Sequence, residues 1–270
     1  MQAFSKALSS LPMRLNLFCL LLSFGFHTSL HAAQFTRDSK HVIRMDGGIV
    51  AGDVDRLARV YDASVTVLKV RSEGGDTEAG MLLGRFIRSK HLDLEINGLC
   101  ASSCANYIFP AARRKLIARG SLLAFHGTAY TTALSSPEKV RRMLVSAGLT
   151  AERADAEVPS VMAAATKQAE LERAFAHDLH IDHAFYREFV NVAKVYDSVH
   201  AQSSDQAMSV LWWPSAQRLL ACYAIANVDD RARPAVLARQ GRYYDDDVSS
   251  MIVGDQGLPA CPHRAPLDPS

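Results

Sequence analysis

Apolar residues in the first half of the chain follow two alternating periodicities. Runs rich in β-branched residues predict strands, and stretches with apolar residues three and four apart predict helices. The predicted strands cover 42–49, 65–70, 92–96, 115–118 and 122–125, and the predicted helices cover 53–62, 77–89 and 103–109. Repeated strand–helix–strand units require right-handed crossovers and a mostly parallel sheet covered by helices.

From Ser135 onward the pattern predicts helices. Pro137-Glu138 opens one, a long Ala-, Glu-, Arg- and Leu-rich stretch covers 151–196, and a short helix covers 215–226. We therefore expect an α/β core over 34–134, a helical extension that completes the domain over 135–253, and a proline-rich tail over 254–270.

Residues 1–33 have the features of a secretory signal peptide. A positively charged start ends at Arg14, an apolar run covers 15–26, and Ala32-Ala33 marks the expected cleavage point; Met13 is an alternative start. The apolar run is shorter than the roughly 20 residues of a membrane-spanning helix. The sequence thus predicts a periplasmic or secreted protein without a stable membrane span after cleavage.

The remaining composition is that of an ordinary globular protein, with 49% hydrophobic and 21% charged residues. Lys plus Arg number 30 and Asp plus Glu 28, and both Lys6 and Arg14 leave with the leader. The mature chain is therefore nearly neutral, so no nucleic acid partner is expected.

Four cysteines remain once Cys19 leaves with the leader. An even number in an oxidising compartment indicates disulfides, and we expect Cys222 to pair with Cys261. Cys100 and Cys104 are close enough on one helical turn for a short bridge, and two buried thiols are the alternative. No further Cys or His pair stands nearby at the spacing of a zinc site.

Three segments carry candidate chemistry. Gly74-Gly75 follows a strand and opens a helix, where backbone amides can face a ligand. Ser102 also stands at a strand-to-helix turn, where helix-start amides can stabilise an oxyanion. His126 ends the strand at 122–125 and could act as a general base. Taken alone, the Gly-Gly turn and the histidine fit a structural role better, as a tight turn and a structural histidine, and the serine fits a helix cap equally well.

In this order, the three segments resemble the Clp protease proteolytic subunit and the wider Clp/crotonase superfamily. The resemblance covers about residues 40–127 and is closest to a branch of predicted periplasmic proteins with a Cys-Ala-Ser-x-Cys-Ala motif. It implies a spiral α/β fold and self-association into a homo-oligomer. It also implies that Ser102 is the nucleophile, His126 the base, and the amides of Gly74 and Ser103 the oxyanion hole.

The chain departs from this pattern at three places. Ser72-Glu73 replaces the usual Ser-Pro before the glycines, and cysteines replace small residues around the serine. The position of the third triad member falls on Met208, with Asp205 one helical turn earlier. Either the alignment slips, Asp205 reaches the histidine, or another group holds it.

Two other polar clusters are weaker candidates. His177, His180 and His183 would share one stripe of a continuous helix and could bind zinc or copper, although a solvated helix face fits them better. The aspartates at 245–247 lack the spacing of a calcium loop. We expect neither a metal nor a cofactor.

The sequence favours a periplasmic serine hydrolase, a peptidase acting on a peptide or protein substrate through an acyl-enzyme. The alternative is a catalytically inactive protein of the same fold that binds peptides or serves in assembly. An acyl-thioester enzyme fits the expected compartment poorly, because coenzyme A is cytoplasmic. Cys104 as the nucleophile with His126 is a minor option.

Overall fold

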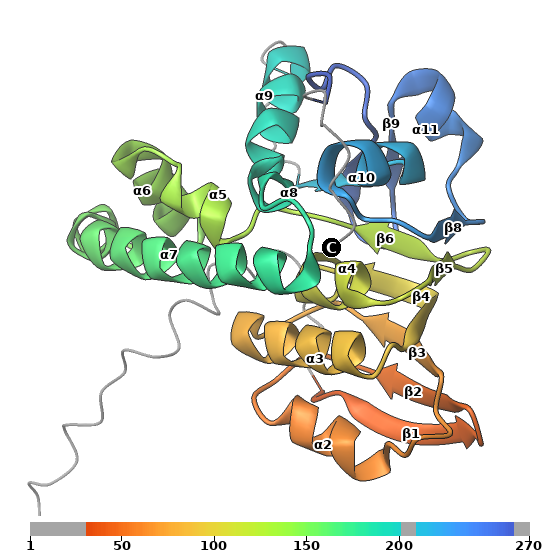
Figure 1. Cartoon of the computed structure of the whole chain (residues 1–270). Helices are drawn as coiled ribbons and strands as arrows, with labels where there is room; N and C mark the ends of the chain where they lie inside the picture. Colours follow the sequence, from red (N-terminus) through yellow and green to blue (C-terminus); the bar gives the residue numbers. More distant parts are fainter. Residues whose placement is uncertain (1–30, 201–208, 262–270) are drawn as a thin grey trace, which may run out of the picture.

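The structure is a computed structural model that describes residues 31–200 and 209–261 (Figure 1). Most of the predicted leader lies outside these residues, as does the end of the proline-rich tail. The two positions considered for the third triad member, Asp205 and Met208, also lie outside the described residues.

The main sheet contains the strands that the sequence predicts and two more. It is formed by β1 (Gln34–Ser39), β2 (Val42–Asp46), β3 (Val67–Ser72), β4 (Asp93–Ala101), β5 (Lys115–Ile117), β6 (Leu122–Ala124) and β8 (Val228–Asp230). The order is β1-β2-β3-β4-β5-β8, with β6 paired to β4. Every pairing is parallel except that of β1 with β2. The predicted mixed α/β fold with a mostly parallel sheet is confirmed.

Strand β4 changes its partner halfway along its length. Residues 94–96 pair with β5, whereas residues 99–101 pair with β6. Gly98 lies between the two halves with φ +109°, a left-handed conformation that glycine adopts without strain. The end of β4 consequently lies beside the end of β6, which brings the two candidate catalytic segments next to each other.

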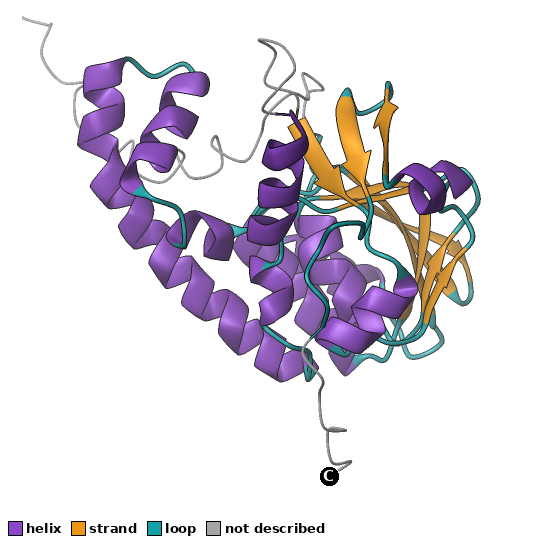
Figure 2. Ribbon diagram, turned by 90° about the horizontal axis from the view of Figure 1, so that it is seen from above, coloured by secondary structure: helices purple, strands orange, loops and turns teal. Residues whose placement is uncertain are grey.

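The described helices lie mostly on one side of the main sheet (Figure 2). They are α2 (Asp53–Val60), α3 (Thr77–Ser89), the π-helix η1 (Cys104–Ile108), α4 (Phe109–Ala111), α5 (Ala129–Ala133), α6 (Pro137–Ser146), α7 (Ala151–Leu179), α8 (Ala184–Arg187), α9 (Phe189–His200), α10 (Ala216–Tyr223) and α11 (Ala235–Gln240). Helix α3 has the predicted bounds, because Asp76 caps its first turn by accepting a hydrogen bond from Ala79 N at 2.7 Å. Its apolar face is buried.

Helices α6 and α7 form an arm that extends from the rest of the molecule (Figure 1). Ser136 and Thr150 cap the two helices through their side chains. The arm has a small apolar core of its own, made of Val140, Leu144, Ala154, Val158 and Val161.

The extension over 135–253 is not wholly helical, which corrects the sequence prediction for its second half. Strands β7 (Ser209–Trp212), β9 (Arg242–Asp245) and β10 (Ser250–Val253) form a separate sheet in the order β7-β10-β9, and β8 joins the main sheet. These strands span only three or four residues, too few periods to distinguish a strand from a turn. Phe125 and Trp212 join the two sheets through mutual backbone hydrogen bonds of 2.9 and 2.7 Å.

The chain at the predicted cleavage point is part of the fold. Ala32 bridges to Gly48, and Ala33 is only 3% exposed. Ala33 N donates to Gly48 O at 2.8 Å, and Gly48 N donates to His31 O at 2.9 Å. A cut after Ala33 would remove these contacts, whereas a cut before His31 would keep them.

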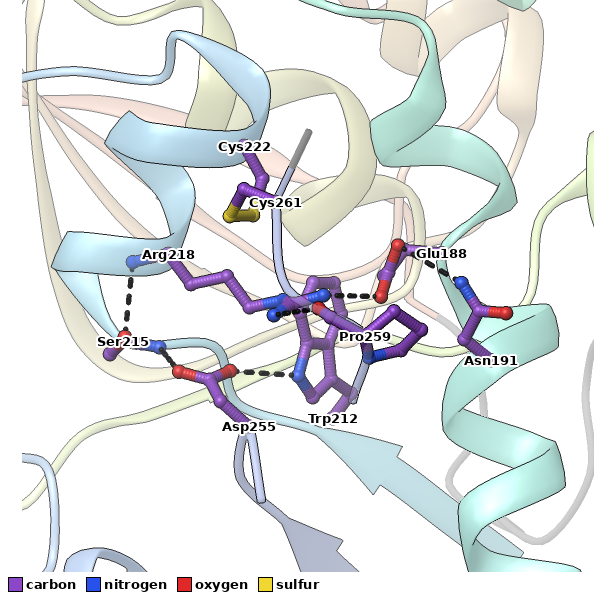
Figure 3. Close-up of a disulfide and its surroundings, with 9 residues drawn as sticks. All are labelled: Glu188, Asn191, Trp212, Ser215, Arg218, Cys222, Asp255, Pro259 and Cys261. Atoms are coloured by element: carbon purple, nitrogen blue, oxygen red, sulfur yellow. Dashed lines mark hydrogen bonds and ion pairs between the residues drawn. A yellow bond between two sulfur atoms is a disulfide. The ribbon is translucent and has the colours of Figure 1, made fainter. Parts of the chain in front are cut away.

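A disulfide attaches the C-terminal segment to α10 (Figure 3). Cys222 and Cys261 are bonded, as the sequence predicts. Arg218 donates to Glu188 Oε1 at 2.6 Å and to Pro259 O at 3.1 Å, so its guanidinium bridges α8 and the C-terminal segment. The segment is therefore held by a covalent bond and by a hydrogen bond from Arg218, which is itself fixed by its ion pair with Glu188.

Asp255 adds a second attachment in the same region (Figure 3). Its carboxylate accepts from Ser215 N at 2.9 Å and from Trp212 Nε1 at 3.3 Å. Trp212 is 1% exposed and is part of the core.

In the part of the chain that the structure describes, no helix combines the length and the apolar character needed to cross a membrane.

We predict that Gly84→Ala destabilises the protein by about 1–3 kcal/mol, as is typical when a close-packed contact is overfilled. A Cβ at Gly84 would lie 2.6 Å from both Phe175 Cζ and Tyr107 O, and the backbone oxygen has no room to move. Urea unfolding measures the change. Leu82→Ala on the exposed side of α3 is the control, and equal stability of Gly84→Ala and the wild type would show that the contact is looser than described.

Candidate active site

Ser102 occupies the turn between β4 and η1 in an unusual backbone conformation. Its φ of +53° lies in the left-handed region, which non-glycine residues seldom adopt. Ser102 N donates to Ala124 O at 3.2 Å, which fixes the turn to the end of β6. The side chain is half-buried, and Oγ makes no hydrogen bond to any described residue. Backbone strain of this kind is concentrated at functional sites.

The amide of Ser103 is a suitable oxyanion donor. Ser103 precedes the first residue of η1, and its N–H has no acceptor within residues 31–200 and 209–261. Its hydroxyl instead donates to Gly75 O at 2.7 Å, which ties the serine turn to the Gly-Gly turn. Unpaired amides at a helix start stabilise negative charge.

Gly74 lies directly against the serine turn. A Cβ at this glycine would come within 2.5 Å of Ser102 Cβ and 2.7 Å of Ser103 N, so only glycine fits. The Gly74 amide, however, donates to Ser72 Oγ at 3.1 Å in this conformation. Of the two amides expected to form the oxyanion hole, only that of Ser103 is free in the structure.

A disulfide brackets the serine turn. Cys100, at the end of β4, is bonded to Cys104, the first residue of η1, and both are fully buried. Of the two alternatives that the sequence leaves open, the structure contains the bridge. The disulfide closes the loop that carries Ser102 and thereby limits its conformations.

His126 has one ring nitrogen held and the other free. Its Nδ1 lies 2.6 Å from Gly127 O. Since a carbonyl oxygen can only accept, Nδ1 carries the hydrogen and Nε2 the lone pair of the neutral ring. Nε2 is buried without a hydrogen-bond partner among the described residues. Burial lowers the pKa of His126 below its usual 6.5, so the ring is neutral at pH 7.

The segments that carry the two candidate catalytic residues leave the sheet at neighbouring strand ends, but their side chains are not joined. Ser102 follows Ala101, the last paired residue of β4, and His126 stands two residues after Ala124, the end of β6. No hydrogen bond connects Ser102 Oγ with His126 Nε2 within the described residues. The acid that the resemblance requires falls at positions outside those residues.

Sequence reasoning missed Glu172, a fully buried carboxyl group on α7. It accepts hydrogen bonds from Tyr107 Oη at 2.5 Å, from Thr128 Oγ1 at 3.0 Å and from Tyr130 N at 3.0 Å. Burial raises the pKa of Glu172 to about 7, although these bonds act in the opposite direction. The sequence does hold a signal: Glu172 stands at helical spacing within the buried stripe formed by Ala165, Gln168, Ala169, Phe175, Ala176 and Leu179.

The three histidines considered for a metal do not share a helix. Helix α7 ends at Leu179, and His180 follows with a left-handed φ of +56°. His183 precedes α8, and both His177 and His183 are exposed. Within the described residues, no group of three His, Cys, Asp or Glu side chains is arranged to hold a metal ion.

Comparisons with known proteins return structures but no family. No family model matches the chain, and no curated protein matches it. A ClpP1 mutant from Listeria monocytogenes is 20% identical, with 44% of this chain and 79% of that chain covered and a TM-score of 0.27. An enoyl-CoA hydratase from Mycobacterium avium subsp. paratuberculosis is 17% identical, with 64% and 92% covered and a TM-score of 0.30.

A third similar structure is a methylmalonyl-CoA decarboxylase in complex with 2-nitronate-propionyl-CoA. It is 12% identical, with 66% of this chain and 86% of that chain covered and a TM-score of 0.29. Proteins of both classes named by the sequence resemblance, the Clp protease and the crotonases, are thus among the structures to which this chain is similar. At these identities and TM-scores, the similarity assigns no activity to the chain.

We predict that Glu172 makes the stability of the fold depend on pH. A carboxyl whose pKa rises from 4.5 to about 7 on folding stabilises the fold fully below pH 4.5, and this contribution is lost as pH rises through 7. The loss amounts to about 3 kcal/mol. Glu172→Gln should therefore gain stability relative to the wild type between pH 5 and pH 8, measured by urea unfolding.

The exposed neighbour Glu170 provides the control, since Glu170→Gln should follow the wild type at every pH. Parallel pH profiles for Glu172→Gln and the wild type would contradict the prediction.

Proposed function

We propose that the protein is a periplasmic serine hydrolase, a peptidase that acts on peptide or protein substrates through an acyl-enzyme. The observation that carries this proposal is the pairing of two groups at the ends of neighbouring strands. Ser102 stands at a left-handed turn in front of the Ser103 amide, and His126 presents an unprotonated Nε2; neither Ser103 N nor His126 Nε2 has a hydrogen-bond partner among the described residues. These are a nucleophile, an oxyanion donor and a base.

In the proposed reaction, Ser102 Oγ attacks the carbonyl carbon of the substrate while His126 Nε2 takes the hydroxyl proton. The tetrahedral intermediate places its negative oxygen on the Ser103 amide. His126 then gives the proton to the leaving amine, which departs as the acyl-enzyme forms. Water, deprotonated by His126, releases the acid and restores Ser102.

The Gly127 carbonyl supports the role of His126 in the absence of an assigned acid. An orienting partner keeps a catalytic histidine in the tautomer whose Nε2 can accept a proton. The 2.6 Å contact between His126 Nδ1 and Gly127 O supplies this tautomer. It does not supply a negative charge to stabilise the protonated ring, and Asp205 remains the candidate for that part.

The compartment and assembly belong to the same proposal. Two disulfides fit a protein that matures in an oxidising environment, such as the periplasm or the cell exterior. Homo-oligomerisation is proposed on the sequence resemblance to the Clp family.

A second candidate function is peptide binding or assembly without catalysis. Two observations favour it. Ser102 Oγ and His126 Nε2 are not hydrogen-bonded to each other. The Gly74 amide donates to Ser72 Oγ, so in this conformation it does not face a substrate oxygen. An inactive protein of this fold would keep both features when a substrate is bound.

We predict that a fluorophosphonate probe labels the purified protein at Ser102. Ser102→Ala should abolish labelling, and His126→Ala should slow it by about three to four orders of magnitude, because the hydroxyl then lacks a base. Intact-mass measurement and gel fluorescence at pH 8 give the extent and rate of labelling.

Ser160→Ala and His177→Ala, both exposed on α7, are matched controls and should label as the wild type does. Absence of labelling in a folded wild type would refute the hydrolase and support the binding protein.

A further inference from the structure

Glu172 connects two parts of the candidate site that are distant in the sequence. Its Oε1 accepts a hydrogen bond from Tyr107 of η1, the helix that begins two residues after Ser102 in the sequence. Its Oε2 accepts from Thr128 and from the amide of Tyr130, in the segment that follows His126. One buried carboxyl group is thus bonded to both the nucleophile's helix and the base's loop.

The nucleophile side of this connection is rigid. Tyr107 is 2% exposed, and a Cβ at Gly80 would lie 3.0 Å from Tyr107 Cδ2 and 3.3 Å from Ser103 Cβ. Tyr186 of α8 lies beside Tyr107, with ring centroids 5.8 Å apart, and donates to Asn106 O at 3.2 Å. A shift of Glu172 therefore changes the packing of η1, and Ser103, the proposed oxyanion donor, directly precedes that helix.

The base side depends on a short loop. Thr128 Oγ1 lies 3.0 Å from Glu172 Oε2 and 3.0 Å from Tyr186 O, and Thr128 is the residue after Gly127. The carbonyl of Gly127 is the group that holds His126 Nδ1. The orientation of the histidine ring is thus determined by a peptide unit that Glu172 fixes from one side.

We propose that Glu172 is a positioning residue of the candidate active site, which sets the orientation of His126 by anchoring the 127–130 loop to α7 and η1. The term "active site" in this inference rests on the proposed function. The connection of Glu172 to the His126 ring rests on the hydrogen bonds alone.

The ionisation state of Glu172 matters to this role because it decides which way the hydrogen bond to Thr128 runs. An ionised carboxylate only accepts, so it takes the one hydroxyl hydrogen of Thr128, which then cannot be donated to Tyr186 O. A protonated carboxyl can donate to Thr128 Oγ1 and leave that hydrogen for Tyr186 O. Titration of Glu172 therefore changes the hydrogen bonds of the segment that follows His126.

The groups around Glu172 do not titrate in the same range. Burial raises the pKa of Tyr107 and of Tyr186 well above 10, so both stay neutral. The hydrogen bond to Tyr130 Oη raises the pKa of Arg173, which stays charged. Arg85 of α3 is paired with Asp178 at 2.8 Å. The ring of His183 lies tilted beside Tyr130, with centroids 6.3 Å apart, and partial desolvation followed by the charges of Arg173 and Arg187 lowers the pKa of His183.

The test is an NMR titration of the ring nitrogens of His126 in protein labelled with ¹⁵N-histidine, with the signals assigned by His126→Ala. In the wild type we expect two steps: the ring's own titration below 6.5 and a second, smaller step near 7 from Glu172. Glu172→Gln should lose the second step and keep the first. Glu170→Gln, at an exposed position two residues before Glu172 on the same helix, should show both steps.

Identical titrations in the wild type and Glu172→Gln, or a single step in the wild type, would overturn the proposal. The wild-type titration decides the matter even if Glu172→Gln fails to fold. Thr128→Val offers a second variant, which removes one of the two bonds to the loop and should shrink the step near pH 7.

Fluorophosphonate labelling separates this inference from the proposed function. Glu172→Gln should label at least about tenfold more slowly than the wild type at pH 8, since small misplacements of catalytic groups reduce rates strongly. Two NMR steps without labelling of the wild type would refute the hydrolase and leave the positioning of His126 standing. Normal labelling of Glu172→Gln with an unchanged titration would refute the positioning and leave the hydrolase standing.

Discussion

The change of partner along β4 is the constraint on which the candidate site depends. Because β4 pairs with β5 over residues 94–96 and with β6 over residues 99–101, its end meets the end of β6 and not that of β5. Gly98 permits this change with a φ of +109°. Ser102 and His126 both stand just beyond these strand ends, so the strand pairing places the segments of the proposed nucleophile and the proposed base beside each other.

Three short-range features then refine that arrangement. The Cys100–Cys104 disulfide closes the serine turn, Gly74 packs against it with no room for a side chain, and the Gly127 carbonyl sets the histidine tautomer. Each acts within a few residues of the reactive groups. Glu172 adds a long-range bond, since α7 lies far along the chain from both turns. A buried carboxyl with a pKa near 7 makes the fold less stable at neutral pH. Functional sites commonly reduce the stability of a fold in this way.

Much of the core could be predicted from the sequence because its elements have clear periodicity. Helix α3 has the bounds that its apolar spacing and the Asp76 cap indicate. The short strands β7 to β10 could not be predicted, since their pairing depends on contacts distant in the sequence. The end of α7 was missed because the left-handed His180 interrupts a pattern that otherwise continues as a helix. Ser102, His126 and Gly74 could be singled out from motifs, whereas the role of Glu172 depends on which face of α7 is buried.

The central claim is that Ser102, His126 and the Ser103 amide act on one reacting group. The most direct test is a crystal structure of the protein after reaction with a fluorophosphonate. The account predicts a phosphonyl group on Ser102 Oγ, with its oxygen on Ser103 N–H and with His126 Nε2 at hydrogen-bond distance from the serine oxygen. An unmodified Ser102, or an adduct whose oxygen points away from Ser103, would contradict it.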